Sequence, residues 1–323
     1  MNIFLRQIGR PAVAGVFTAL VYFSGLLLFL TPLPLFYLSW NAKKGEWFFG
    51  VFFAFAIGFL FNFAVLPENL SLSPSEIFLN FSCYLYYLCM AFILSLGVWK
   101  RWRLEKMGGV ATLMVSALTV MGALLIQRLG FADIHGVFQG FLAESSKMLD
   151  QMALSQPQDK QAEMLFLAAQ TKEWLAILPK LFPSLVFLAT LLTAVLNIGI
   201  PRLFYRGSKP MKWAGDFKRL QLPSVALWAL ITGGVLYFLD TYYFQTDILK
   251  IAAINLAIAA LSVYFLQGLS IMAFFLMRYS LLFLFGIYGL LILFFQMVGL
   301  VVVGLGVADT WIDFRKLQKK ETI

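Results

Sequence analysis

The last apolar run of the sequence ends in GLVVVGLGVADTWIDFRK, residues 299–316, where it meets water. The run carries three glycines, Gly299, Gly304 and Gly306. Glycines in a membrane helix allow a neighbouring helix to approach closely, while Trp311 and the basic residues after it are typical of a membrane rim. The stretch therefore predicts a membrane-spanning helix with a carboxylate, Asp309, at its edge.

The composition extends this prediction to the whole chain. Apolar residues make up 61% and charged residues only 13%, against about 25% charged residues in soluble proteins. The apolar runs are continuous and about twenty residues long, which predicts helices rather than the alternating strands of a barrel. We expect an all-α, polytopic helical membrane protein with about eight to ten membrane segments, some of them short and broken by Pro or Gly. We treat 1–323 as a single integral membrane domain.

The net charge of +9 does not indicate nucleic-acid binding. The basic residues cluster in short loops between apolar runs, as the positive-inside rule requires. The clearest cluster is 201–222, with six basic residues and one acid. We expect this loop, 100–106 and the C-terminus to be cytoplasmic, in the cytoplasmic (inner) membrane of a bacterium. The lipid bilayer is then the first partner.

For two apolar stretches the sequence does not decide how many times the chain crosses the membrane. In 12–41, Pro32 and Pro34 break the helix, which favours a hairpin with a turn near 31–34. The alternative is one long tilted helix with the N-terminus outside. The stretch 281–307 is longer than one span needs, and we expect it to break near 296–299 into a second hairpin rather than cross once.

The only long polar insertion is 130–180. Its apolar residues recur at helical spacing on both sides of a turn at Gln156–Asp159, which predicts an amphipathic helical hairpin. We place it outside the cytoplasm. It either forms a lid or partner-binding cap, or lies on the membrane surface.

The sequence carries no pattern of catalytic chemistry. The single histidine, His135, has no neighbouring ligand for a metal, and no phosphate-binding loop or GxSxG elbow is present. Cys83 and Cys89 lie about 9 Å apart along a helix, too far for a disulfide. We expect no metal and no cofactor, and a non-catalytic role is favoured over an enzyme.

Polar side chains inside the spans are the best candidates for a ligand site, because their burial costs free energy. The ligand-binding candidates are Asn197, Asn255, Gln267 and Gln296, with Asn62 and Asn80 as further intramembrane amides. The alternative for each amide is a hydrogen bond between helices.

Asp309 needs a partner at its depth. Arg315 is nearly two helical turns away, so we expect a structural ion pair with Arg278 or with the basic loop 202–219. The alternative is a solvated carboxylate. Gly15 and Ala19 form a small-xxx-small patch on the first helix, which permits close packing within the chain or with a partner.

Three segments resemble the YybS-like family of uncharacterised bacterial membrane proteins: FKRLQLPSVALW (217–228), FLQGLSIMAFF (265–275) and GLGVADTWIDFRK (304–316). That family looks distantly similar to the substrate-binding S components of energy-coupling factor transporters. The resemblance implies capture of a small molecule from outside and docking on a membrane partner through small residues of the first helix, here Gly15 and Ala19. The patch is not a clean Ala-xxx-Ala match, and the chain is longer than a typical S component.

Two functions follow from these observations. The first is a substrate-binding or transport-type membrane protein without catalytic activity, for which a polar pocket among the later spans is expected. The second is a scaffold or assembly protein of the cell envelope, which would hold a protein partner with the outer hairpin.

Overall fold

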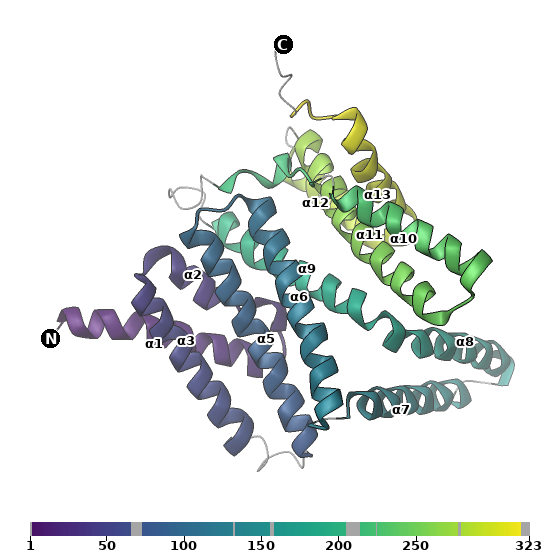
Figure 1. The fold of residues 1–323 in the computed structure, drawn as a ribbon, viewed down its shortest axis with the longest axis horizontal. Coiled ribbons are helices and arrows are strands. Elements are labelled where there is room, and N and C mark those ends of the chain that lie inside the picture. Colours follow the sequence, from purple (N-terminus) through teal and green to yellow (C-terminus); the bar gives the residue numbers. More distant parts are fainter. Residues whose placement is uncertain are drawn as a thin grey trace. The chain divides into compact units, whose positions relative to one another are not determined.

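The structure is a computed structural model that describes residues 2–65, 73–131, 133–155, 158–204, 214–223, 225–276 and 279–317. The described residues are almost entirely helical (Figure 1). Seven helical stretches are long and apolar enough to cross a membrane. The predicted fold class, a polytopic all-α membrane protein, is confirmed.

The chain divides into two compact units: 1–95 with 112–197, and 96–111 with 198–323. The expectation of one integral membrane domain stays a prediction.

The first unit begins with a broken helix. Helix α1 (Asn2–Phe23) ends before Gly25, whose φ of +69° takes the chain out of the helix. A short 3-10 turn, η1 (Leu28–Leu30), leads into α2 (Leu33–Asn41), which packs against α1. The stretch therefore doubles back, as the hairpin interpretation predicts, but the break comes several residues before the two prolines.

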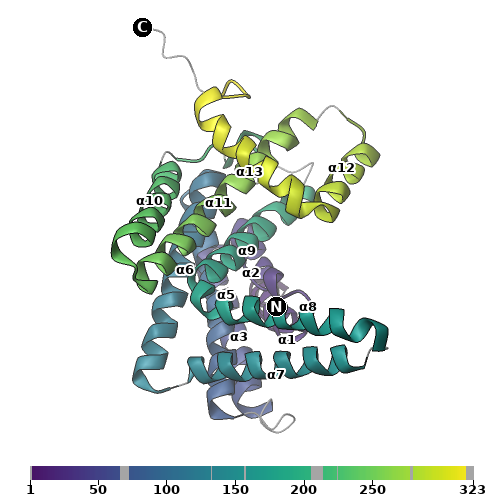
Figure 2. The same cartoon turned by 90° about the vertical axis from the view of Figure 1, so that its right-hand side faces the viewer.

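Four further spans and the insertion complete this unit. They are α3 (Lys44–Leu60) with a π-helical end η2 (Phe61–Val65), α5 (Pro74–Trp99), α6 (Leu104–Leu129), α7 (Ile134–Leu154), α8 (Gln158–Ile177), η3 (Leu178–Leu181) and α9 (Phe182–Phe204). The connected ends of α5 and α6, within 96–111, and the last residues of α9, from 198, are part of the second unit. Helices α7 and α8 lie side by side as a hairpin (Figure 2), and Lys172 pairs with Asp150 across it at 2.7 Å.

Aromatic side chains form the core of the first unit. Tyr84 is fully buried, and its hydroxyl donates to the carbonyl of Ala54 at 2.8 Å. A Cβ at Gly58 would overlap the Tyr84 ring, so glycine at this position lets α3 and α5 meet around a tyrosine. Trp47 is buried likewise and donates to the Leu35 carbonyl at 2.9 Å, which fixes α2 on α3.

The second unit holds the last helices. They are η5 (Phe217–Arg219), α10 (Val225–Leu239) with the π-helical η6 (Asp240–Phe244), α11 (Asp247–Phe275), α12 (Leu281–Leu293) and α13 (Phe295–Ile312). Helix α11 is central and packs against both α10 and α13. The long apolar stretch 281–307 is broken, as predicted, but at Phe294, two residues earlier than expected. Figure 2 shows α12 and α13 meeting at an angle there.

Candidate functional site

The most extensive polar cluster among the described residues surrounds a buried ion pair at the end of α13. Arg315 Nη2 lies 2.7 Å from Asp309 Oδ2, and the two side chains are only 0% and 3% exposed. A buried charge is tolerated when it is paired and most of its remaining hydrogen-bonding groups find partners. Here both Nη atoms of Arg315 are engaged, and its Nε has no partner among the described residues. The cluster is therefore expected to hold several elements together. We call it the C-terminal lock.

The chain reaches this geometry because α13 stops at Ile312. Asp313 adopts the left-handed conformation with φ 43°, which aspartate tolerates better than most residues. The chain then folds back over the helix end, where the Phe314 amide donates to Asp309 Oδ1 at 3.1 Å. This reversal brings Arg315 onto a carboxylate only six residues earlier.

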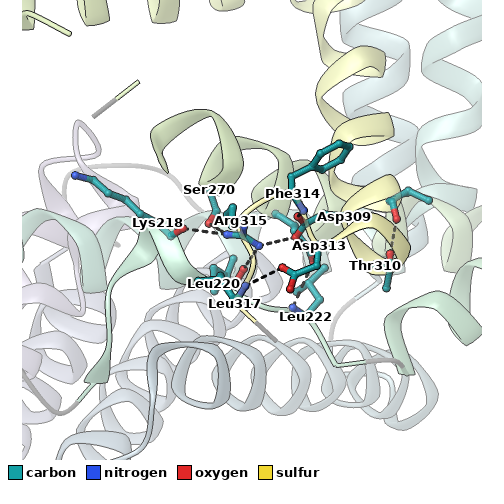
Figure 3. Close-up of polar contacts among 12 residues, drawn as sticks. Lys218, Leu220, Leu222, Ser270, Asp309, Thr310, Asp313, Phe314, Arg315 and Leu317 are labelled. Carbon is teal, nitrogen blue, oxygen red and sulfur yellow. Dashed lines mark hydrogen bonds and ion pairs between the residues drawn. The ribbon is translucent and has the colours of Figure 1, made fainter. Parts of the chain in front are cut away.

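Arg315 donates to three further acceptors on two other segments, 217–222 and α11 (Figure 3). Its Nη1 donates to the carbonyl of Lys218 at 3.0 Å and to Ser270 Oγ at 2.7 Å. Its Nη2 donates to the carbonyl of Leu220 at 2.8 Å. A planar guanidinium can serve such diverging acceptors, whereas an ammonium on a flexible stem would not.

Gln267 completes the lock from α11. Its Nε2 donates to Asp309 Oδ2 at 3.0 Å, and its Oε1 accepts from the Leu222 amide at 3.3 Å. Ser270, one turn further along α11, donates to the Phe217 carbonyl at 2.6 Å. The lock thus ties α11, α13, the chain after α13 and the segment 217–222 into one polar unit.

The partner of Asp309 differs from the expected one. Sequence spacing placed Arg315 too far away, and this reasoning is wrong because the chain leaves the helix at Asp313. Arg278 lies outside the described residues, so the predicted pair with it stays a prediction. The expectation of a solvated carboxylate does not fit the nearly complete burial of Asp309.

The four predicted ligand-binding amides lie in different surroundings. Asn197 is fully buried in the first unit, and its Nδ2 donates to the carbonyls of Phe29 and Thr193. Asn255 donates within α11 to the Ile251 carbonyl at 2.8 Å, Gln267 belongs to the lock, and Gln296 is exposed near the start of α13. Asn255 and Gln267 are about 18 Å apart along one helix. Their role in ligand binding stays a prediction.

Two buried amides keep an oxygen without a hydrogen bond among the described residues. These oxygens are Oδ1 of Asn62 and Oδ1 of Asn197. Asn62 is fully buried and lies in the π-helical end of α3, a distortion that is frequent at functional sites. An unsatisfied acceptor inside a span needs a donor, either water or a ligand.

The small residues identified in the sequence differ in how closely neighbouring helices approach them. A Cβ at Gly15 would overlap the backbone of α3 at Gly50 and Ala54, and Ala19 is 1% exposed, so in this structure the patch packs inside the unit. A Cβ at Gly306 would overlap the Tyr264 carbonyl of α11. Gly304 has open space around it, and Gly299 is buried against its own helix.

Sequence reasoning did not identify Arg315 or Ser270 as parts of the site. The sequence feature that could have indicated Arg315 is Asp313. Aspartate tolerates the left-handed conformation at a helix end, and such an end would turn the chain back toward Asp309. The contribution of the carbonyls of Lys218 and Leu220 has no sequence signature, since any residue supplies it.

The described residues contain no group of three or more His, Cys, Asp or Glu side chains arranged to hold a metal ion. The side chain of His135 lies outside what the structure describes. Cys83 and Cys89 are free thiols, both at exposed positions of α5, as the spacing argument against a disulfide predicts.

A family model described as "Predicted membrane protein (DUF2232)" matches residues 12–310. The chain belongs to this family. The match spans nearly the whole chain, in agreement with the helical membrane architecture. No curated protein and no solved structure matches the chain. The finer likeness to YybS-like proteins and to S components stays a prediction.

Proposed function

We propose that this membrane protein binds a small polar ligand among its spans, as substrate-binding proteins of the S-component type do, and that it has no catalytic role. The observation that carries the proposal is the pair of unsatisfied amide oxygens on Asn62 and Asn197. Leaving such a group unpaired costs about 1–3 kcal/mol. A ligand with N–H or O–H donors would recover that free energy.

The proposal rests on Asn197 and Asn62 more than on the other amides. Both are fully buried within one unit, and each fixes its side-chain nitrogen on a backbone carbonyl, which leaves the oxygen preoriented. Gln267 is already engaged on both sides in the lock. Asn255 and Gln296 are retained as secondary candidates.

Native mass spectrometry of the detergent-purified protein tests this function. We expect a co-purifying small molecule whose occupancy falls in Asn62→Ala and in Asn197→Ala. Gln170→Ala, at an exposed position of α8, is the matched control and should keep the wild-type occupancy. Each variant is also compared by thermal unfolding, so that lost binding is separated from lost folding. A wild-type protein without a bound small molecule, or equal occupancy in all variants, contradicts the proposal.

The orientation of the chain in the membrane is part of the same proposal. We place the protein in the cytoplasmic membrane of a bacterium, with the α7–α8 hairpin outside and the C-terminus inside. The support is the charge contrast between the loops: 201–222 is strongly basic, whereas 130–180 carries six acids and four lysines.

A scaffold role is the second candidate, and one observation favours it. Four apolar side chains of α7 lie on one face and are exposed: Val137, Phe141, Met148 and Met152. A photo-crosslinker at Phe141, with Gln139 on the opposite face as the control, separates the two functions in native membranes. A discrete protein adduct at Phe141 alone supports the scaffold, and its absence removes this candidate.

A further inference from the structure

A cleft of about 430 Å³ opens in the second unit beside the C-terminal lock. One wall comes from Arg103, in the connection between α5 and α6, and from Glu105, in the first turn of α6. The other comes from Gly215, Asp216 and Arg219, just before and within η5. Its volume falls within the range of about 300–1,000 Å³ that is usual for small-molecule sites.

The second wall is fixed in place by groups already described. The lock binds the carbonyls of Lys218 and Leu220 on either side of Arg219. Arg202 donates to the Gly215 carbonyl at 2.6 Å, and Asp216 caps η5 through the Lys218 amide at 3.4 Å. The cleft is thus built on a segment with a buried anchor rather than on a free loop.

The lining presents both signs of charge. Arg103 and Arg219 supply two guanidinium groups, while Glu105 and Asp216 supply two carboxylates. Glu105 is only 18% exposed and lies 3.4 Å from Arg103, a loose pair that leaves room for another ligand. The backbone amide of Arg219 donates to the Asp216 carbonyl at 2.9 Å, whereas its guanidinium has no hydrogen bond or ion pair with another described residue. Arg202 also interacts electrostatically with Asp216 and Glu105. The cleft therefore offers cationic and anionic groups together, which favours a zwitterion over a simple anion.

The cleft lies close to the ends of three spans. Arg103 immediately precedes α6 and follows the end of α5 at Trp99, and Arg219 precedes α10. Trp102 directly precedes Arg103 in the sequence. The ammonium groups of Lys100 and Lys106 lie 5.7 Å and 5.3 Å from the centroid of its ring. Tryptophan and lysine at span ends are typical of the headgroup layer. At this depth the abundant zwitterion is a phospholipid headgroup.

We propose that this cleft binds a phosphoethanolamine headgroup of a membrane phospholipid. The phosphodiester lies between Arg103 and Arg219, where guanidinium groups make charge-assisted hydrogen bonds to its oxygens. The primary ammonium donates to Glu105 and Asp216. The site is independent of the ligand proposed among the spans, because it involves none of the same residues.

Native mass spectrometry with added lipid tests the site on the full chain. Phosphatidylethanolamine is compared with phosphatidylglycerol, which lacks the cation, and with phosphatidylcholine, whose trimethylammonium cannot donate hydrogen bonds. We expect phosphatidylethanolamine to be retained at least about tenfold more strongly than either, since each comparison removes charged hydrogen bonds. Free phosphoethanolamine is added as a competitor. Displacement of the lipid by an equimolar amount of this soluble compound would overturn the lipid as the ligand.

Two variants assign the binding to the cleft. Arg219→Gln and Asp216→Asn should each reduce retention of phosphatidylethanolamine about tenfold or more. Arg128→Gln, at an exposed arginine in the last turn of α6, is the matched control and should leave it unchanged. Thermal unfolding verifies that the variants are folded. Stronger retention of phosphatidylglycerol, or an equal effect of Arg219→Gln and Arg128→Gln, overturns the proposal.

Discussion

Arg315 contacts a carboxylate, a serine and two backbone carbonyls at once. Asp309 and Ser270 are buried, and the carbonyls of Lys218 and Leu220 are partly buried. Pairs of this kind stabilise little relative to an apolar replacement, but breaking one leaves an uncompensated buried charge. The lock therefore stabilises the fold only when all of its groups are present, and removal of a single group should cost free energy of unfolding.

Asp309→Asn should lower the free energy of unfolding by about 3–5 kcal/mol, because it leaves the guanidinium of Arg315 buried without a counter-charge. Thermal unfolding in detergent measures the change. Asp313→Asn is the matched control, since asparagine also tolerates the left-handed conformation and keeps an acceptor for the Leu317 amide, now at 3.0 Å. It should change little. If the two substitutions behave alike, the lock does not stabilise the protein.

The residue scale also shows what the sequence could not supply. That Asp309 needs a buried partner could be predicted from its position at the edge of a span. The identity of the partner could not, because it depends on the single backbone reversal at Asp313. The carbonyls that receive Arg315 come from a segment almost a hundred residues away in sequence.

At the scale of elements, close helix crossings explain where α11 and α13 meet. Gly268 of α11 lies against the Val302 carbonyl, and Gly306 of α13 against the Tyr264 carbonyl, so that each helix brings a glycine to the backbone of the other. Without a hydrophobic driving force between helices in lipid, close van der Waals packing of this kind holds spans together.

Gly306→Ala should therefore destabilise the protein by about 1–3 kcal/mol, the usual cost of forcing atoms into a packed contact. Gly304→Ala lies two residues earlier in the same helix, where a Cβ meets nothing within 4 Å. It should be neutral or stabilise by up to about 1 kcal/mol through helix propensity. Unfolding in detergent compares the two variants. Equal stability of both would contradict a close crossing at Gly306.

The helices themselves were largely predictable, because each long apolar run becomes a helix at nearly the expected bounds. The positions at which the two long apolar stretches break were less predictable. The first stretch turns at Gly25 rather than at its two prolines, and the last one turns at Phe294, a residue with no turn preference. Pro32 instead precedes the first turn of α2, where a missing amide proton costs nothing.

At the scale of the whole molecule, orientation depends on charge rather than on packing. Lysine and arginine in short loops set the side of the membrane on which a loop stays. The loop 201–222 and the chain after α13 are basic, and the lock joins their described parts, 217–222 and Arg315. These two segments must therefore lie on the same side, whichever side that is.

Cysteine labelling in intact cells determines that side. The native thiols, Cys83 and Cys89, are first replaced by alanine. Ser208→Cys then reports on the basic loop and Gln139→Cys on the α7–α8 hairpin. We expect an impermeant reagent to label Gln139→Cys in intact cells and Ser208→Cys only after permeabilisation, because the positive-inside rule keeps the basic loop in the cytoplasm. Labelling of Ser208→Cys in intact cells would reverse the topology. A third cysteine at Lys316, close to the lock, should behave as Ser208→Cys does, since the lock holds the two segments on one face; opposite behaviour would contradict the lock itself.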